Sequence, residues 1–283
     1  MTDEDAPARG REAMGSTHSY ADNLAGQRSI VELLDAQQAL RPRTLMSKLF
    51  GIAPLTDETR TLYQSVIGEA EVGEALATLG DSWITIHSLP VAAGGADIDH
   101  LVVGPTGVYI VTTRNHARQT VWASQRTLMV GGIRFPDIRN MEYEMGRVER
   151  LLSTATGRSV EVSGILAVVS PKSLTVRQKH RDVEVLASTE IAPWLQRRRR
   201  VLSPDDVREI AAAAARPATW APDATAHLDT VELAERFQKL RAEVGRAWRV
   251  QLAWVLVASS LAAGGFLAVT YVILLTSLGL LPH

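Results

Sequence analysis

The chain has 283 residues, 46% of them apolar, which suffices for one core of about 150 residues with flanking segments rather than two full domains. The charges nearly cancel at a formal −1, so no global field draws the protein to nucleic acid or anionic lipid. Cysteine is absent, which excludes disulfides, thiolate metal sites and cysteine nucleophiles. Residues 1–28 lack the apolar stretch of a signal peptide, so we expect none.

Residues 1–60 are predicted to be a flexible N-terminal region with a short helix. Residues 1–27 carry few large apolar side chains among scattered Gly, Ser, Asp and Asn, a composition typical of a disordered tail. The short helix is expected over Ser29 to Leu40, and Pro42 to Pro54 is expected to be a linker that packs partially.

Residues 61–220 are predicted to form an α/β domain. The first helix is expected over 61–79, where apolar residues recur at helical spacing, and ends at Gly80-Asp81. Four-residue turn signals at 104–107 separate two β-branched runs and predict a hairpin. The strands expected in this half of the domain are 83–89, 98–103, 108–113, 120–123 and 127–130, all in one sheet.

The second half of the domain alternates helix and strand. Helices are expected over 137–156, 189–197 and 204–215, and strands over 162–169 and 183–186. Ser203-Pro204-Asp205-Asp206 is a strong helix start, with a capping hydroxyl, Pro in the first turn and acids near the helix N-terminus. This order predicts an α/β or α+β fold, a mixed sheet flanked by helices.

The C-terminal part predicts a membrane anchor. Residues 221–250 are expected to be a linker followed by an amphipathic juxtamembrane helix, and residues 251–282 a transmembrane helix. Leu252 to Pro282 contains no charged residue over 31 positions, whereas about 20 apolar residues suffice to cross a bilayer. A buried core helix is the alternative, but such helices seldom stay uncharged on every face for so long.

Charges on the two sides of this span predict its orientation. Five basic residues precede it and only His283 follows, which favours a single-pass protein of the cell membrane with its soluble domain facing the cytoplasm. The basic residues are Arg236, Lys239, Arg241, Arg246 and Arg249. Ser260, Gly264 and Ala268 have the small-residue spacing that permits pairing into a homo-oligomer, and lipid contact or a mild kink is the alternative.

One stretch of the domain resembles a known family. Gly73-Glu74, the segment from Asp97-Ile98-Asp99-His100 to Gly104-Pro105-Thr106-Gly107-Val108, and Thr112-Thr113-Arg114-Asn115 are similar to the nuclease-related domain, NERD, of the PD-(D/E)xK nuclease superfamily. The resemblance covers roughly residues 68–186, and Arg139-Asn140 and Glu144 fit it as well. It implies a restriction-endonuclease-like fold.

The resemblance also implies a catalytic site, which we place at Glu74, Asp99, Thr112 and Arg114. Such nucleases hold Mg²⁺ or Mn²⁺ with carboxylates, here Asp99 and the helix-borne Glu74. The family's acid-x-Lys element reads Thr112-Thr113-Arg114, so one anionic ligand is replaced by a neutral hydroxyl. Arg114 can grip a phosphate but cannot exchange protons as a buried Lys can. Asp97 or Glu71 could supply a replacement ligand.

Two functions follow from these residues. The first is a membrane-anchored nuclease-related protein that binds nucleic acid, with weak or absent metal-dependent cleavage. The second is a catalytically inactive, membrane-attached interaction or scaffold protein that has kept the fold. Isolated Asp or Glu residues more often form hydrogen bonds or face solvent than bind metal, so the site depends on how these side chains converge.

Overall fold

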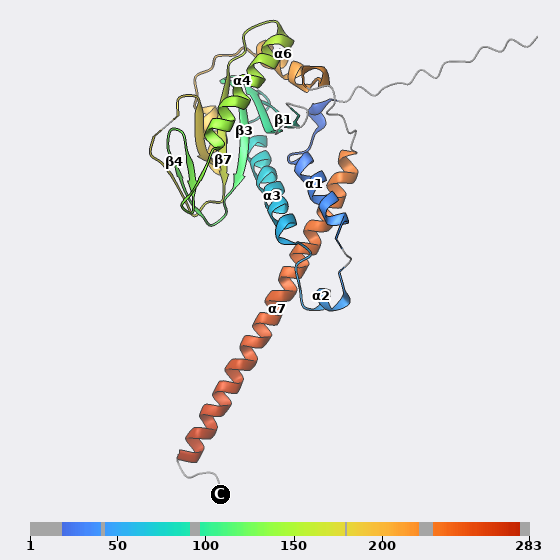
Figure 1. Cartoon of the computed structure of the whole chain (residues 1–283), viewed down its shortest axis with the longest axis vertical. Helices are drawn as coiled ribbons and strands as arrows, with labels where there is room; N and C mark the ends of the chain where they lie inside the picture. The colour runs from blue at the N-terminus through green and yellow to red at the C-terminus, as the bar shows by residue number, and fades with distance from the viewer. Residues whose placement is uncertain (1–18, 41–42, 91–96, 179, 221–228, 278–283) are drawn as a thin grey trace, which may run out of the picture.

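The structure is a computed structural model that describes residues 19–40, 43–90, 97–178, 180–220 and 229–277. The predicted tail over 1–18, the linker over 221–228 and the end of the predicted span after Ser277 lie outside the described residues. The fold is mixed α+β, with two mixed sheets flanked by helices and one long C-terminal helix (Figure 1).

The main sheet contains five strands in the order β1-β2-β3-β7-β9. Strands β1, β2 and β3 are antiparallel, whereas β3, β7 and β9 run parallel. Their bounds are Ile84–Leu89, Ile98–Gly104, Gly107–Asn115, Val162–Val169 and Val183–Ala187. The predicted hairpin is confirmed: Gly104 and Gly107 close it, and the ring of Trp83 packs directly on Gly104.

Helices cover both faces of the main sheet. Helices α4 (Asp137–Thr156) and α6 (Pro204–Ala215) bury one apolar stripe each against one face. Helices α3 (Asp57–Ala77) and α5 (Ile191–Gln196) cover the other face, with a 3-10 turn, η2 (Ser188–Glu190), before α5. The predicted start of α6 is confirmed, because the Ser203 side chain accepts a hydrogen bond from the Asp206 backbone N–H in a capping box.

The strands predicted to extend the main sheet form a second sheet instead. Its order is β6-β5-β4-β8, with bounds Ile133–Phe135, Leu128–Val130, Thr120–Ala123 and Ser173–Val176. The parallel β4–β8 pair prolongs the parallel β3–β7 pair, since Arg118 N–H donates to Ser170 O and Lys172 N–H to Gln119 O. The segments that follow β3 and β7 therefore leave the main sheet side by side. We call the second sheet the accessory sheet.

The N-terminal residues take part in the packing. Tyr20, in a 3-10 turn (η1, Tyr20–Asp22), is only 3% exposed, and Asn23 Nδ2 donates to the backbone oxygens of His87 and Ser88 at 3.1 Å each. The prediction of a disordered tail is therefore wrong for residues 19–23. Helix α1 (Gln27–Gln38) confirms the predicted short helix, and the predicted linker contains a further helix, α2 (Leu45–Leu49).

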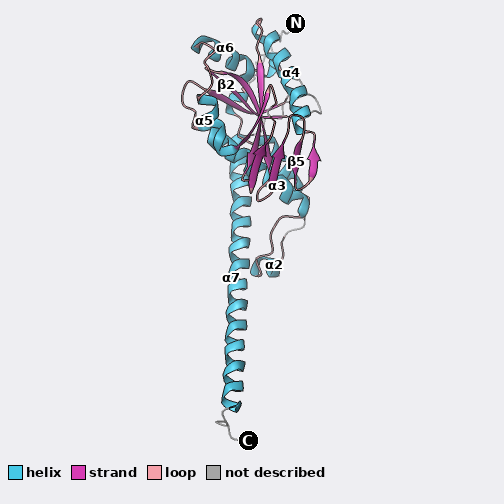
Figure 2. Cartoon of the chain, turned by 90° about the vertical axis from the view of Figure 1, so that its left-hand side faces the viewer, coloured by secondary structure: helices cyan, strands magenta, loops and turns pink. Residues whose placement is uncertain are grey.

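The C-terminal helix α7 (Thr230–Ser277) is continuous from the domain to its far end (Figure 2). A 3-10 turn, η3 (Pro217–Thr219), and the buried Trp220 precede it in the chain. Its first turns pack on the domain, because Leu233 and Phe237 are buried among apolar residues of α1 and α3. Its distal part has a mean hydropathy of 2.0 and none of it is buried, so its length and composition allow it to cross a membrane.

Candidate functional site

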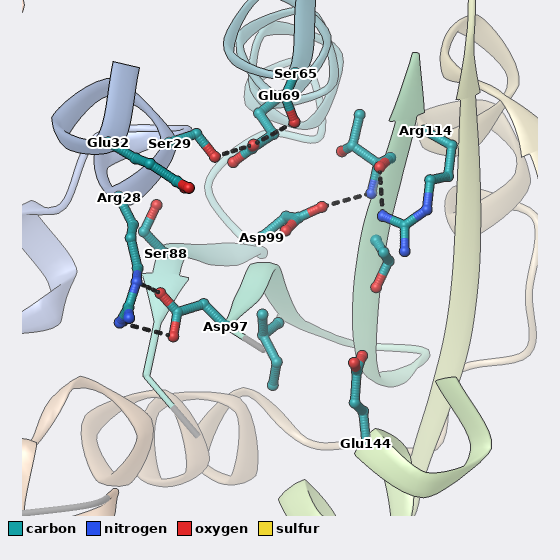
Figure 3. Close-up of a pocket in the computed structure, with 13 residues that line it drawn as sticks. Arg28, Ser29, Glu32, Ser65, Glu69, Ser88, Asp97, Asp99, Arg114 and Glu144 are labelled. Atoms are coloured by element: carbon teal, nitrogen blue, oxygen red, sulfur yellow. Dashed lines mark hydrogen bonds and ion pairs between the residues drawn. The ribbon is translucent and has the colours of Figure 1, made fainter. Parts of the chain in front are cut away.

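A hollow of about 300 Å³ lies where β2 and β3 separate (Figure 3). The last paired residues of the two strands at this end are His100 and Val111. Beyond them, the Asp99 side chain replaces the missing ladder bond: Thr113 N–H donates to Asp99 Oδ2 at 2.6 Å. The gap between the strands is therefore lined by a carboxylate.

Three of the four predicted site residues come together here. Asp99, Thr112 and Arg114 all line the hollow. Continuing the register places Asp99 opposite Thr112, and residues two apart in a strand share a face, so Arg114 lies on the same side as Thr112. The Arg114 guanidinium is held by Asp137 on α4, with Nε to Oδ1 at 2.8 Å, and also donates to Thr113 O at 2.9 Å.

Glu74, the fourth predicted residue, lies elsewhere. It is exposed on α3 and outside the residues that line the hollow. Of the two suggested replacements, Glu71 accepts a hydrogen bond from Ser188 Oγ at 2.7 Å and is also outside the lining. Asp97 does line the hollow but forms an ion pair with Arg28, with Nε to Oδ2 at 3.0 Å.

Glu69 is the α3 carboxyl group that reaches the hollow, and the sequence patterns did not single it out. It is only 5% exposed and accepts hydrogen bonds from Ser29 Oγ at 2.6 Å and Ser65 Oγ at 3.3 Å. A signal was present in the sequence, because Glu69 lies midway between Val66 and Val72 on the buried stripe of α3. An acid on such a stripe needs polar partners.

Figure 3 shows the carboxyl groups around the hollow, with Asp99 between Glu69 of α3 and Glu144 of α4 and with Arg114 on the β3 side. Glu144, which also fitted the family resemblance, thus belongs to this site. The Arg28–Asp97 ion pair lies at a further side of the hollow.

Burial raises the pKa of all three central carboxyl groups. The pKa of Glu69 is raised to about 8 by burial and then by the charge of Asp99. Burial raises the pKa of Asp99 to about 6, although the Thr113 N–H and Arg114 oppose the shift. The pKa of Glu144 rises to about 7, first through burial and then through Asp99. The charge of the hollow therefore changes between about pH 6 and 8.

A comparison with protein families assigns this region. The family model described as the nuclease-related domain matches residues 64–169, from α3 to the end of β7. The chain carries a nuclease-related domain. The matched segment contains Glu69, Asp99, Thr112, Arg114 and Glu144, and the assignment is consistent with the PD-(D/E)xK-like superfamily. No curated protein and no solved structure matches the chain.

Within its described residues, the nuclease-related domain shows no preformed site for a divalent cation. Among the described residues, no group of three or more His, Asp or Glu side chains is arranged to hold an ion. Thr112 contributes a neutral hydroxyl beside Asp99, and the Arg114 guanidinium lies on the same wall of the hollow. Mg²⁺ needs several hard anionic or carbonyl oxygens at near-octahedral positions. The residues as they lie do not fit Mg²⁺ or Mn²⁺, and we assign no chemical step to either ion.

Proposed function

We propose that this chain is a membrane-anchored nuclease-related protein that binds nucleic acid at the cytoplasmic membrane face, with weak or absent metal-dependent cleavage. One observation carries the proposal: Asp99, Thr112 and Arg114 line one hollow within the nuclease-related domain. Arg114 offers a planar donor group suited to a phosphate. The anchor in this proposal is α7, whose apolar part is exposed on all sides.

The lack of a negative charge at position 112 is the reason to expect little cleavage. An acid there would supply a second carboxylate directly opposite Asp99, and Thr112 lacks that charge. One oxygen of Asp99 is also already engaged by the Thr113 N–H. Fewer free carboxylate oxygens hold a hard cation less tightly, and the cation is what would polarise the phosphate and activate water.

The accessory sheet supplies the positive surface that the acid-rich hollow lacks. Residues 116–135 and 170–178, which form it with its connections, contain five basic residues and no Asp or Glu. The basic residues are Arg118, Arg126, Arg134, Lys172 and Arg177. In a protein of net charge −1 this is a local basic patch, the electrostatic feature expected of a phosphate-backbone contact.

The face of the accessory sheet that points away from the core also carries an aromatic ring. Register places Trp122 beside Met129 and Thr175, and Met129 beside Arg134, so these side chains share one face. The Arg177 guanidinium lies over the Trp122 ring, 5.7 Å from its centroid. A ring flanked by cations is the arrangement that holds unpaired bases by stacking while neighbouring charges hold phosphates.

The proposal is tested with the full chain in nanodiscs. Fluorescent single-stranded and double-stranded DNA and RNA are titrated at low salt, with EDTA, Mg²⁺ or Mn²⁺, and both anisotropy and strand length are followed. We expect salt-sensitive binding, with single strands preferred, and little or no shortening of the strands. Absence of binding to every nucleic acid at low salt would contradict the proposal.

The inactive scaffold remains the second candidate, favoured by the neutral Thr112 and by the Asp99 hydrogen bond to backbone. Metal-dependent cleavage that is lost in Asp99→Ala would exclude it. A restoring variant, Thr112→Glu with Arg114→Lys, should create or raise Mg²⁺-dependent cleavage if Asp99 and Glu69 are otherwise placed for it. No gain of activity in that variant would favour the scaffold.

A further inference from the structure

The loop around α2 exposes an unusual amount of apolar side chain. Five large apolar residues fall within eight positions, and each is about half exposed or more: Leu45 84%, Met46 62%, Leu49 54%, Phe50 47% and Ile52 58%. Leu45, Met46, Leu49 and Phe50 have the spacing that gathers them on one side of a helical turn. Contiguous apolar patches of this kind on a soluble surface mark a contact with a partner or a membrane.

The loop lies against α7 at the point where the charge-free segment begins. Gly51 packs so closely on α7 that a Cβ there would come within 2.5 Å of Ala247 O and Gln251 N. Trp254 Nε1 donates to Leu49 O at 2.9 Å, and the rings of Phe50 and Trp254 are 5.6 Å apart. The last charged residue of α7, Arg249, lies just before this contact. Figure 2 shows α2 beside α7, away from the sheets.

The α2 loop is ordered by its own polar contacts. The Thr44 side chain caps α2 by accepting from Ser47 N–H at 3.1 Å. The Arg43 guanidinium donates to Ser47 O at 3.2 Å and to Ile52 O, which closes the loop from start to end. The loop is therefore held by contacts of its own and by the Trp254 hydrogen bond to Leu49 O, while its apolar side chains remain exposed.

We infer that the α2 loop lies in the interfacial layer of the bilayer that α7 enters, as a second membrane contact of the same chain. This inference rests on the proposed anchoring by α7. The ligand is a lipid surface, because Phe50 beside α2 contacts Trp254 on the exposed apolar part of α7, and the two side chains are 47% and 44% exposed. An amphipathic segment at this depth buries its apolar side among acyl chains, and the exposed Lys48 can reach headgroups.

The inference gives α2 a structural role. A single helix crossing a bilayer is free to rotate about its axis and to tilt. A second membrane contact on one side of that helix limits both its rotation about its axis and its tilt. Since α1 and α3 pack on the first turns of α7, the nuclease-related domain would be held in one orientation above the membrane.

The absence of cysteine from the chain allows a clean probe experiment. Three single-cysteine variants of the full chain are labelled with an environment-sensitive nitrobenzoxadiazole dye and reconstituted in phosphatidylcholine vesicles. Met46→Cys reports on α2, Leu261→Cys on α7, and Ile133→Cys, on the accessory sheet and 65% exposed, is the matched apolar control in water. Lipids carrying a spin-label quencher near the headgroup or deep in the acyl chain measure depth.

We expect the Met46 probe to be quenched most by the shallow quencher, the Leu261 probe most by the deep quencher, and the Ile133 probe by neither. A deep-quenched Leu261 probe with an unquenched Met46 probe would overturn the inference while leaving the anchor intact. An unquenched Leu261 probe would overturn both. If the Met46 probe is unquenched by both lipids and its dye reports an apolar environment only at a high protein-to-lipid ratio, the α2 surface instead contacts a second copy of the chain.

Discussion

At the scale of single residues, the hollow holds Glu69, Asp99 and Glu144 in surroundings that disfavour their charged forms. The folded protein holds protons on Glu69 up to about pH 8, whereas an exposed Glu loses them near 4.5. Between these values the folded state binds more protons than the unfolded chain, so stability falls as pH rises and the full cost is present above about pH 8. Burial of a carboxyl group thus destabilises the fold at alkaline pH.

Glu69→Gln should remove this pH dependence. The amide keeps an acceptor for Ser29 and Ser65 but has no charge. We therefore expect the free energy of unfolding of the variant to exceed that of the wild type by roughly 2 to 5 kcal/mol at pH 9 and by little at pH 4.5. Thermal unfolding of the full chain in mild detergent measures the difference. Glu74→Gln, exposed on the same helix, should show no such trend. A gain that is equal at both pH values would contradict the prediction.

The same carboxyl groups should govern the pH dependence of nucleic-acid binding. Glu69, Glu144 and Asp99 become charged between about pH 6 and 8, and each new negative charge repels a phosphate near Arg114. Affinity should therefore weaken as pH rises through this range. Glu69→Gln with Glu144→Gln should bind more tightly at pH 8 and show a flatter profile, measured by anisotropy at constant salt. Binding that strengthens with pH would contradict this.

The strand residues Asp99, Thr112 and Arg114 that line the hollow were named from the sequence, but Glu69 of α3 was not. The resemblance to the nuclease-related domain grouped Asp99, Thr112 and Arg114, and alternation along a strand places Thr112 and Arg114 on one face. The choice between Glu69 and Glu74 on α3 depends on which side of that helix faces the gap between β2 and β3. That rotation is set by packing of Val66 and Val72 on other elements, which a motif does not contain.

At the scale of elements, the β2–β3 hairpin depends on a glycine under a ring. A Cβ at Gly104 would come within 2.0 Å of the Trp83 ring, so Gly104→Ala must displace that ring. We expect a loss of about 1–3 kcal/mol in the free energy of unfolding, measured with denaturant. Gly146→Ala on α4, where the nearest atom is 3.9 Å away, should instead gain about 0.5–1 kcal/mol. Equal effects of both substitutions would argue against the packing role.

The accessory sheet should contribute phosphate contacts independently of the hollow. Changing Arg126, Arg134 and Arg177 to Gln should make the decline of log affinity with log salt concentration less steep, by about 2 to 3 in the slope. Trp122→Leu should weaken single-strand binding by roughly 10-fold with the slope unchanged, because stacking carries no charge.

The control for this charge removal is an equal one elsewhere on the surface. Arg60, Arg208 and Arg241 are exposed on three helices, and changing them to Gln removes the same net charge. If both triple variants lose affinity equally, only net charge matters and the accessory sheet is not a binding surface.

Long periodic elements and the short strand over 120–123 were predictable, whereas β6, β8 and α2 were not. The helix over residues 137–156 and the strand over 162–169 match the structure at both ends, because each buries a regular apolar pattern. Strands β6 and β8 have largely exposed residues and form only by pairing with neighbours. Helix α2 has a visible apolar pattern but its partner, α7, lies about 200 residues away in the chain.

At the scale of the whole molecule, α7 joins the nuclease-related domain to the proposed membrane span without a break. Five basic residues on its domain side predict a cytoplasmic domain. In intact cells, a membrane-impermeant maleimide should label His283→Cys from outside and leave Ile133→Cys unlabelled until the membrane is permeabilised. The reverse labelling pattern would contradict the predicted orientation.

The whole-molecule arrangement was predictable only in part. An uncharged run of 31 residues predicts a membrane span by composition alone. The cluster that joins α1, α3 and α7 through Leu33, Val66 and Phe237 could not be inferred, because it brings together residues about 200 positions apart with no shared motif.

The unbroken course of α7 limits where the protein can act. A helix rises about 1.5 Å per residue, so the roughly 20 residues between Thr230 and the uncharged segment form a stiff rod about 30 Å long, packed along part of its length on α1 and α3. A flexible tether would let the domain move through a large volume, whereas this rod would hold the domain at a nearly fixed distance from the proposed membrane span. In the proposed function, the nuclease-related domain would therefore meet only polynucleotides that come close to the membrane, which suits surveillance of molecules that enter or leave through it.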